Sequence, residues 1–256
     1  MKTNLLVLFT IFIFAATISL PLLKPGLHLI HDDQQVARLF LFDQSLKSGQ
    51  FPIRWVDGLG FGYGYPLFVF YPPLVYIIGE AFHLLGFSFI DSIKLVIFVG
   101  IFASGLAMYI FARSKFGRLP AVIASLFYLF VPYRALDIYV RGALAESFSF
   151  VWLPLILWSL AKLTETKKVI YIYLSAIFLA LLMITHNLIF LPFMLILPLY
   201  LLFLIWKSND KKTSILHTQY SILLGFSLSA FFWMPALAEK KYTIVDDLLL
   251  VNLADY

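Results

Sequence analysis

The sequence predicts an all-α membrane protein, a polytopic bundle of about seven transmembrane helices. Of its 256 residues, 62% are hydrophobic and only 13% are charged, whereas an ordinary soluble domain is about a quarter charged. The apolar residues form several runs of about 20 residues, the length that crosses a bilayer. Short basic clusters separate these runs, as they do in membrane proteins whose loops carry orientation charge.

Charge and cysteine content exclude several other classes of protein. The formal net charge is +5, but the basic residues lie between apolar runs rather than on one basic domain. We therefore expect the lipid bilayer, and no nucleic acid, as a partner. The chain has no cysteine, which excludes disulfides, zinc–cysteine sites and thiol chemistry.

Seven apolar segments are predicted to span the membrane. The run after Lys2 is too long for a signal peptide and has no small-residue cleavage site, so we interpret it as an uncleaved anchor helix. An eighth apolar stretch, 65–86, contains three prolines together with Glu80 and His83, and would make a poor lipid-facing helix. The predicted spans are 4–23, 92–112, 119–136, 142–161, 169–186, 188–206 and 215–235.

The distribution of basic residues orients these spans. If 65–86 does not cross, more than half of the 19 basic residues fall in short cytoplasmic segments, as the positive-inside rule requires. We therefore predict a multi-pass plasma-membrane protein with a cytoplasmic N-terminus, and a helix over 70–86 that lies along the outer membrane surface or dips partway into it. The loop 24–91, the segment 133–146, the His186–Asn187 corner and the tail 236–256 then share the extracytoplasmic side.

The first outer loop is predicted to carry surface-lying amphipathic helices. Residues 34–47 place Val36, Leu39, Phe40, Phe42 and Leu46 roughly on one side, with charged residues elsewhere. This pattern predicts an interfacial helix, ended by Ser48-Gly49.

An aspartate pair opens that loop. Asp32 and Asp33 follow His31, and two adjacent carboxylates repel unless a positive group or a shared proton compensates. One could act as a general base or a metal ligand while the other orients it. Capping of the following helix explains the same residues equally well, and the two roles can coexist.

A second polar group lies near the end of the third predicted span. Arg134, Asp137 and Arg141 are three and four residues apart, so on a helix they share one face. Guanidinium groups at a membrane surface suit a phosphate or pyrophosphate. An ion-pair ladder against lipid headgroups is the alternative. Glu146 enters the next span, where an ionisable group is costly and usually functional.

Two further motifs are less specific. His186 and Asn187 lie where a two-span hairpin turns, and a histidine there could contact a phosphate or relay a proton. The stretch 55–66 alternates glycine with aromatic residues, including Tyr63 and Tyr65. Such aromatics stack on sugar rings or a lipid chain, although interfacial aromatics occur in many membrane proteins.

Taken together, these motifs resemble a known group of proteins. The chain is similar to the C-type (GT-C) glycosyltransferase superfamily, and more closely to the prokaryotic multi-spanning proteins labelled "6-pyruvoyl-tetrahydropterin synthase-related domain". The resemblance covers nearly the whole chain, in order. Its motifs are His31-Asp32-Asp33, residues 49–55 (GQFPIRW), 60–68 (GFGYGYPLF), 71–74 (YPPL), 116–118 (FGR), 139–146 (YVRGALAE) and Thr185-His186-Asn187.

The resemblance implies a sugar transfer from a polyprenyl-phosphate donor to a glycan, lipid or protein acceptor outside the cytoplasm. Asp32 and Asp33 would supply the catalytic base or hold Mg²⁺ or Mn²⁺. Arg141 and Arg134, with His186, would hold the lipid phosphate. The supporting residues would be Glu146, His31, Asn187, Tyr63 and Tyr65.

The resemblance also sets the domain expectation and leaves two other functions open. Residues 1–256 would form one transmembrane module, with 24–91 as the outer loop. Relatives are usually longer, which suggests truncation at the C-terminus. A transporter or flippase for a lipid-linked glycan would show ionisable residues deep in several spans and inverted repeats. A non-catalytic relative would bind such lipids without turnover.

Overall fold

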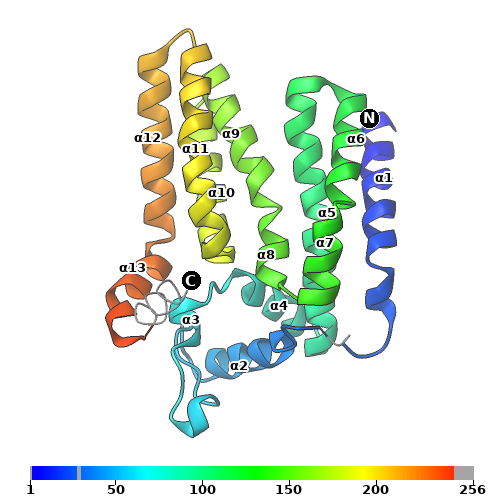
Figure 1. Cartoon of the computed structure of the whole chain (residues 1–256), viewed down its shortest axis with the longest axis vertical. Helices are drawn as coiled ribbons and strands as arrows, with labels where there is room; N and C mark the ends of the chain where they lie inside the picture. Colours follow the sequence, from blue (N-terminus) through cyan, green and yellow to red (C-terminus); the bar gives the residue numbers. More distant parts are fainter. Residues whose placement is uncertain (1, 28–29, 245–256) are drawn as a thin grey trace, which may run out of the picture.

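The computed structural model describes residues 2–27 and 30–244, and its regular elements are helices (Figure 1). Within these residues there is no strand, and only an isolated bridge joins Val56 to Tyr65. The predicted all-α class is confirmed. The part of the predicted tail beyond Ile244 lies outside the described residues.

The α-helices divide into the main helices of the bundle and the elements between or beside them. The main bundle helices are α1 (Lys2–Ile18), α5 (Phe89–Phe116), α6 (Arg118–Leu129), α9 (Trp152–Thr166), α10 (Ile170–Thr185), α11 (Asn187–Lys207) and α12 (Lys211–Leu228). The other α-helices are α2 (Gln35–Lys47), α3 (Leu67–Phe70), α4 (Leu74–Leu84), α7 (Pro132–Leu136), α8 (Leu144–Ser149) and α13 (Ala230–Glu239). The remaining helical turns are η1 (Leu20–Leu23), η2 (Gly60–Gly62), η3 (Asp137–Arg141) and η4 (Lys240–Tyr242), of which η3 is a π-helix.

Four helical segments among the described residues are long and apolar enough to cross a membrane, and a fifth qualifies if one bent pair counts as a single span. The four cover Phe89–Phe116, Arg118–Arg141, Leu144–Thr166 and Asn187–Lys207. The bent pair, Lys211–Leu228 with Ala230–Tyr242, turns by 66°.

The other predicted spans form shorter helices. The 16 residues of α10 rise about 24 Å, less than the ~30 Å of a hydrocarbon core. In the first predicted span, α1 ends at Ile18, three residues before Pro21. The proline-rich stretch 65–86 breaks into α3 and α4, which have 4 and 11 residues, so neither is long enough to cross by itself.

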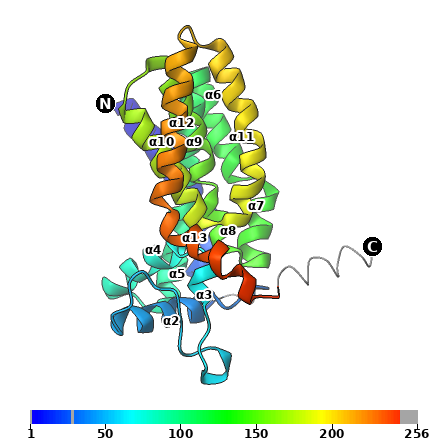
Figure 2. The same cartoon turned by 90° about the vertical axis from the view of Figure 1, so that its left-hand side faces the viewer.

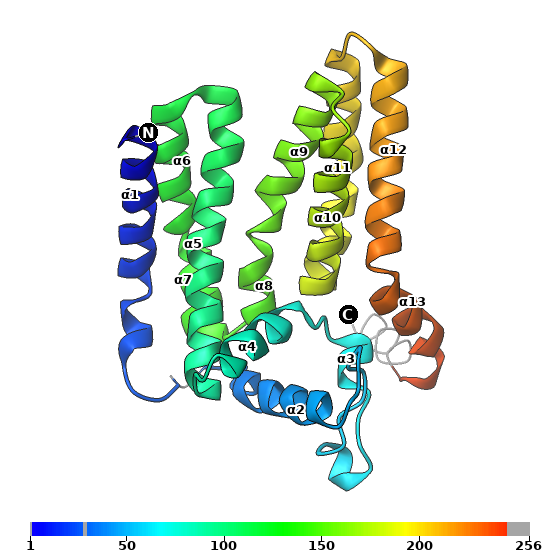
Figure 3. The ribbon, with the colours of Figure 1, turned by 180° about the vertical axis from the view of Figure 1, so that it is seen from behind.

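The bundle consists of two groups of upright helices joined at one end. Figures 1 and 3 show α1, α5, α6 and α7 in one group and α9 to α12 in the other, with α2, α3 and α4 lying across a common end. The view in Figure 2 confirms that this crossing layer lies beyond the same end of both groups. The turns α5–α6, α9–α10 and α11–α12 lie at the opposite end, which we call the lysine-rich end.

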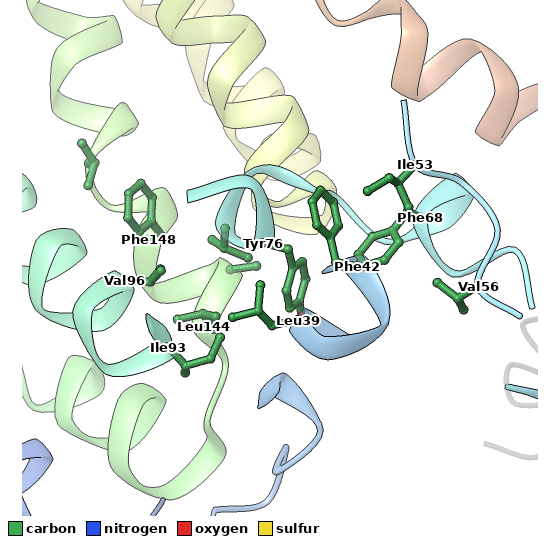
Figure 4. Packing of buried hydrophobic residues seen from close by; sticks show 13 residues of the cluster. Leu39, Phe42, Ile53, Val56, Phe68, Tyr76, Ile93, Val96, Leu144 and Phe148 are labelled. Carbon is green, nitrogen blue, oxygen red and sulfur yellow. The ribbon is translucent and has the colours of Figure 1, made fainter. Parts of the chain in front are cut away.

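An apolar cluster fastens α2 and α4 to the bundle (Figure 4). Leu39 and Phe42 of α2 are buried against Tyr76 of α4 and Val96 of α5. The ring of Phe68 lies edge-on to Phe42 at 5.2 Å and to Tyr76 at 5.4 Å. Side chains of this size each contribute about 1.5–3 kcal/mol when buried, so the crossing layer is an integral part of the core.

Two details of the predicted helix over 34–47 are wrong. The residue at its N-cap is Gln34, with no side-chain capping bond, so neither Asp32 nor Asp33 caps it. Its buried side also differs, because Phe40 is 43% exposed while Asp43 is buried. The helix packs on α4 and α5 rather than on lipid alone, and these neighbours determine which side is covered.

Candidate functional site

The helical segment that begins with α6 is interrupted within residues 133–146, where several polar residues lie. The α-helix α7 passes into the π-helix η3, which ends at Gly142 with φ +71° before α8 begins. A π-turn widens the backbone and often marks a functional site. Positive φ favours glycine, and a Cβ on Gly142 would lie 2.5 Å from Cδ1 of Ile30. The turn between η3 and α8 therefore requires glycine at position 142.

Four side chains around the π-turn form an arginine–carboxylate cluster, composed of Tyr133, Asp137, Arg141 and Glu146. The Nη1 atom of Arg141 lies 2.9 Å from Oδ1 of Asp137 and 3.0 Å from Oε2 of Glu146. It also donates to the Tyr133 hydroxyl at 2.9 Å, and that hydroxyl donates to Glu146. All these Arg141 contacts use one nitrogen, while 44% of the side chain is exposed. The other N–H groups of the guanidinium can therefore donate to a further anion.

Arg134 lies beside this cluster but in a different environment. It is 1% exposed, and Nε, Nη1 and Nη2 make no hydrogen bond among the described residues. Its guanidinium carbon instead lies 4.8 Å from the centre of the Phe150 ring and 5.6 Å from that of Tyr128. Of the two arginines predicted to share a face with Asp137, only Arg141 forms an ion pair with it in the part of the chain that the structure describes.

Asp32 belongs to a second group, the Asp32 network, made of Asp32, Gln35, Arg38, Tyr71 and Tyr76. Gln35 donates to Oδ2 of Asp32 at 2.8 Å and receives the Tyr76 hydroxyl at 2.6 Å. Arg38 lies 3.4 Å from the same Oδ2 and 4.4 Å from the centre of the Tyr71 ring. These contacts hold one side of the carboxylate, and Oδ1 can accept a proton or a hydrogen bond.

The main chain joins the two groups. His31 and Asp32 donate their backbone N–H groups to the carbonyls of Val140 and Arg141, at 2.9 and 2.8 Å. Gln35 also donates to the carbonyl of Gly142 at 2.9 Å. Residues more than 100 positions apart in sequence are therefore held in one polar region by α2 and the π-turn.

A cavity of about 520 Å³ opens beside the Asp32 network. Arg38 and Tyr71 belong to both, and the other walls are mostly aromatic or aliphatic. The lining residues are Gln34, Ala37, Arg38, Leu41, Leu59, Tyr65, Leu67, Phe70 and Tyr71. Aromatic faces with a few donors provide the surface that a sugar ring requires.

His186 lies at the α10–α11 corner and approaches the arginine–carboxylate cluster. Its Nδ1 accepts the backbone N–H of Ile189 at 3.0 Å, so it caps α11, and a neutral ring would then carry its proton on Nε2. The imidazole is close enough to Glu146 and Arg141 to interact with their charges. Asn187, the first residue of α11, is half-buried.

The remaining predicted residues lie further out. Asp33 and His31 are exposed. Tyr63, 89% exposed, projects from the glycine-rich loop, whereas Tyr65 lines the cavity. Gly64 packs so closely on Trp55 that a Cβ would lie 2.0 Å from the indole nitrogen, which explains this glycine of the motif.

These residues do not form a metal cage by themselves. Among residues 2–27 and 30–244 no three His, Asp or Glu side chains are placed to share an ion. Oδ2 of Asp32 is held by Gln35 and lies near the cationic Arg38. Mg²⁺ often binds one or two carboxylates together with substrate phosphates, so any ion at Asp32 and Asp33 would depend on oxygens from the substrate.

Sequence reasoning missed several polar residues of this region. Gln35 lies three positions after Asp32, a spacing that could have indicated it, whereas Arg38, six positions after Asp32, follows no such pattern. A buried pair, Asp43 of α2 and Glu80 of α4, was also missed. The two are 3% exposed each, and Lys47 binds Asp43 at 2.8 Å. Burial, then the charge of Asp43, raises the pKa of Glu80.

The fold and the site define an all-helical membrane protein with a polar region at one end of its bundle. The sequence profile of the family "6-pyruvoyl-tetrahydropterin synthase related domain; membrane protein" matches residues 68–248. The chain belongs to this family. The matched range contains Arg134, Arg141, Glu146 and His186, and it begins after Asp32 and Asp33. No curated protein matches the chain.

Proposed function

We propose that this protein is a membrane glycosyltransferase, or a module of one, with a GT-C-like arrangement of seven spans. It would take a sugar from a polyprenyl-phosphate donor and pass it to a glycan, lipid or protein acceptor outside the cytoplasm. The plasma membrane as its location and the cytoplasmic N-terminus belong to the same proposal, and the orientation rests on the positive-inside rule.

One observation carries the proposal. Asp32, a carboxylate with an available oxygen, is bonded through its backbone to Arg141, whose guanidinium is partly exposed. Transfer from a lipid phosphate needs a base near the acceptor hydroxyl and a cation where the leaving phosphate gains charge. The chain holds both kinds of group in one region, beside a cavity with aromatic walls.

Each residue would have a distinct part in the transfer. Asp32 would accept the proton of the acceptor hydroxyl on Oδ1, and Gln35 would hold its other oxygen in place. Arg141 would bind the departing phosphate through the edge not used by Asp137 and Glu146, with His186 as a second donor. Arg134 would add long-range positive charge from the core. A Mg²⁺ or Mn²⁺ ion, if used, would screen the donor phosphate near Asp32 and Asp33.

The test is transfer of labelled sugar by the purified full chain in lipid vesicles, from a panel of polyprenyl-phosphate sugars, with and without Mg²⁺ or Mn²⁺. We expect Asp32→Asn to lower the rate at least 100-fold, since it removes the base. Asp33→Asn should have a smaller effect, and the exposed Asp57→Asn is the matched control. Full activity of Asp32→Asn would overturn the assignment.

The same assay distinguishes the other functions. Movement of the labelled lipid across the vesicle without sugar transfer would identify a transporter. Binding of the lipid without turnover or movement would identify a non-catalytic member of the family.

A further inference from the structure

A second cavity lies at the lysine-rich end, far from the Asp32 network. It has a volume of about 690 Å³ and lies between the end of α5, the end of α9 and the end of α11. Figure 3 shows α5 and α9 in different helix groups, so the cavity lies between the two groups near this end. We call it the lysine crevice, and its walls include Phe111, Lys115, Glu165, Lys167, Phe203 and Lys207.

Positive charge exceeds negative charge in and beside this crevice. Glu165 is shared by two lysines, because it binds both Lys115 and Lys162. The Asp210 carboxylate caps α12 by accepting the N–H of Thr213 at 3.0 Å. Lys207 forms no salt bridge with any acidic side chain that the structure describes. The crevice therefore has unneutralised ammonium groups that favour an anion.

Lys167 has a strained backbone conformation, and its ammonium group forms no salt bridge with a described carboxylate, although the charge of Asp210 acts on it. Its φ is +58°, a left-handed conformation that costs a non-glycine residue of order 1–3 kcal/mol. The ammonium donates to the Thr164 carbonyl and to the Ser208 hydroxyl, both at 2.7 Å, and also to Ser214. All three acceptors are neutral, so its charge adds to the surplus of the crevice.

The walls of the crevice are apolar below these ammonium groups. Phe111 from α5 and Phe203 and Leu204 from α11 line it, and both helices are long and apolar enough to span a membrane. A free inorganic anion would gain nothing from such walls, whereas an acyl chain would bury its methylenes at about 0.8 kcal/mol each. An anionic headgroup with attached chains matches both parts.

We infer that the lysine crevice binds an anionic phospholipid, with the headgroup phosphate at Lys115 and Lys207 and an acyl chain along Phe111 and Phe203. Ammonium groups at the end of membrane helices lie at the level of lipid headgroups and attract anionic ones. Bound there, the lipid would fill the space between the two helix groups and hold their separation constant at this end.

The experiment measures binding of phosphatidylglycerol to the purified full chain in detergent, by native mass spectrometry. Phosphatidylcholine with the same chains tests the headgroup charge, and glycerol 3-phosphate and inorganic phosphate test a free anion. We expect phosphatidylglycerol to bind at least tenfold more tightly than phosphatidylcholine, and neither soluble anion to compete at millimolar concentration. The double variant Lys115→Gln/Lys207→Gln should lose at least tenfold in affinity.

Two further variants test whether binding is specific to the lysine crevice. Lys168→Gln/Lys212→Gln removes the same charge from exposed positions at the same end but outside the crevice, and it should change affinity less than twofold. Lys115→Arg/Lys207→Arg should retain binding. Equal loss in the Lys168/Lys212 control would show non-specific charge attraction, and competition by inorganic phosphate would show a free-anion site. Either result would overturn the proposal.

Discussion

The two ends of the helix bundle differ in the burial and pairing of their charged side chains. At the end covered by α2 and α4, which we call the matched end, two buried carboxylates pair with one partly exposed arginine: Asp137 is fully buried, Glu146 is 9% exposed, and both bind Arg141. At the lysine-rich end, the ammonium groups outnumber the carboxylates and face water or the lysine crevice. A buried charge requires a partner, whereas an exposed one does not. A charged substrate that binds at the matched end would therefore change the balance of charge around these buried groups.

The largest expected effect concerns the side of the membrane on which each end of the bundle lies. The chain has no native cysteine, so single cysteines at Ser48 and Ser114 can be labelled without background. Ser48 ends α2, and Ser114 lies in the last turn of α5. A membrane-impermeant maleimide added to intact cells should modify Ser48→Cys fully and Ser114→Cys only after permeabilisation. Labelling of both in the same compartment would contradict the opposed ends.

Removal of Arg141 should affect the matched end more than any other single change to its charges. Arg141→Gln leaves Asp137 and Glu146 buried without their cation, which we expect to cost about 3 kcal/mol of unfolding free energy. Denaturant unfolding in detergent micelles measures it. At the other end, Lys212→Gln should cost less than about 0.5 kcal/mol.

A compensating variant sharpens that comparison. If the cost arises from unpaired charge, Arg141→Gln/Asp137→Asn/Glu146→Gln should regain most of the lost stability. A triple variant as unstable as Arg141→Gln would show that packing, not charge, is the main contribution.

Gly142 tests whether the matched end depends on close backbone contact. Gly142→Ala places a Cβ 2.5 Å from Ile30 and 3.1 Å from the Asp32 carbonyl, in addition to φ +71°. We expect a loss of about 2 kcal/mol, since strain at positive φ costs 1–3 kcal/mol, measured by the same unfolding assay. Gly26→Ala, with φ +76° and open space, is the matched control and should lose less. Equal losses would mean that strain alone is responsible.

Glu80 should give the smallest effect, as a pH dependence of stability. Its pKa is raised above 4.5 by burial and by Asp43. The folded protein therefore holds a proton that the unfolded chain has released, and stability falls as pH rises from about 4.5 through the raised folded pKa.

In Glu80→Gln this decline should flatten, and the variant should be more stable than the wild type at neutral pH, because it does not carry the charge that burial disfavours. Unfolding followed from pH 4 to pH 8 measures it. Asp57→Asn, on the exposed loop, should keep the wild-type profile. Asp43, Lys47 and His83 remain in both variants, so an unchanged profile in Glu80→Gln would assign the decline to them.

Composition and apolar run length determined the membrane class and the position of each bundle helix. These properties are local, because a helix in lipid satisfies its own backbone bonds. They did not determine how many helices are long enough to cross: Pro21 and the prolines between 66 and 73 interrupt otherwise apolar stretches. Nor did periodicity predict the burial of Asp43, which depends on α4 packing against that side of α2.

In the polar region, the difference between what the sequence determined and what the tertiary structure determined is clearer. The sequence by itself determined that Asp137 and Arg141 are close, because they are four residues apart on a helix. Only the tertiary structure decided that the backbone of Asp32 bonds to Arg141, that Gln35 links both groups, and that Arg134 is enclosed by aromatic rings. The physical reason is separation along the chain: more than 100 residues lie between Gln35 and Gly142, and contacts over that range depend on how whole helices pack.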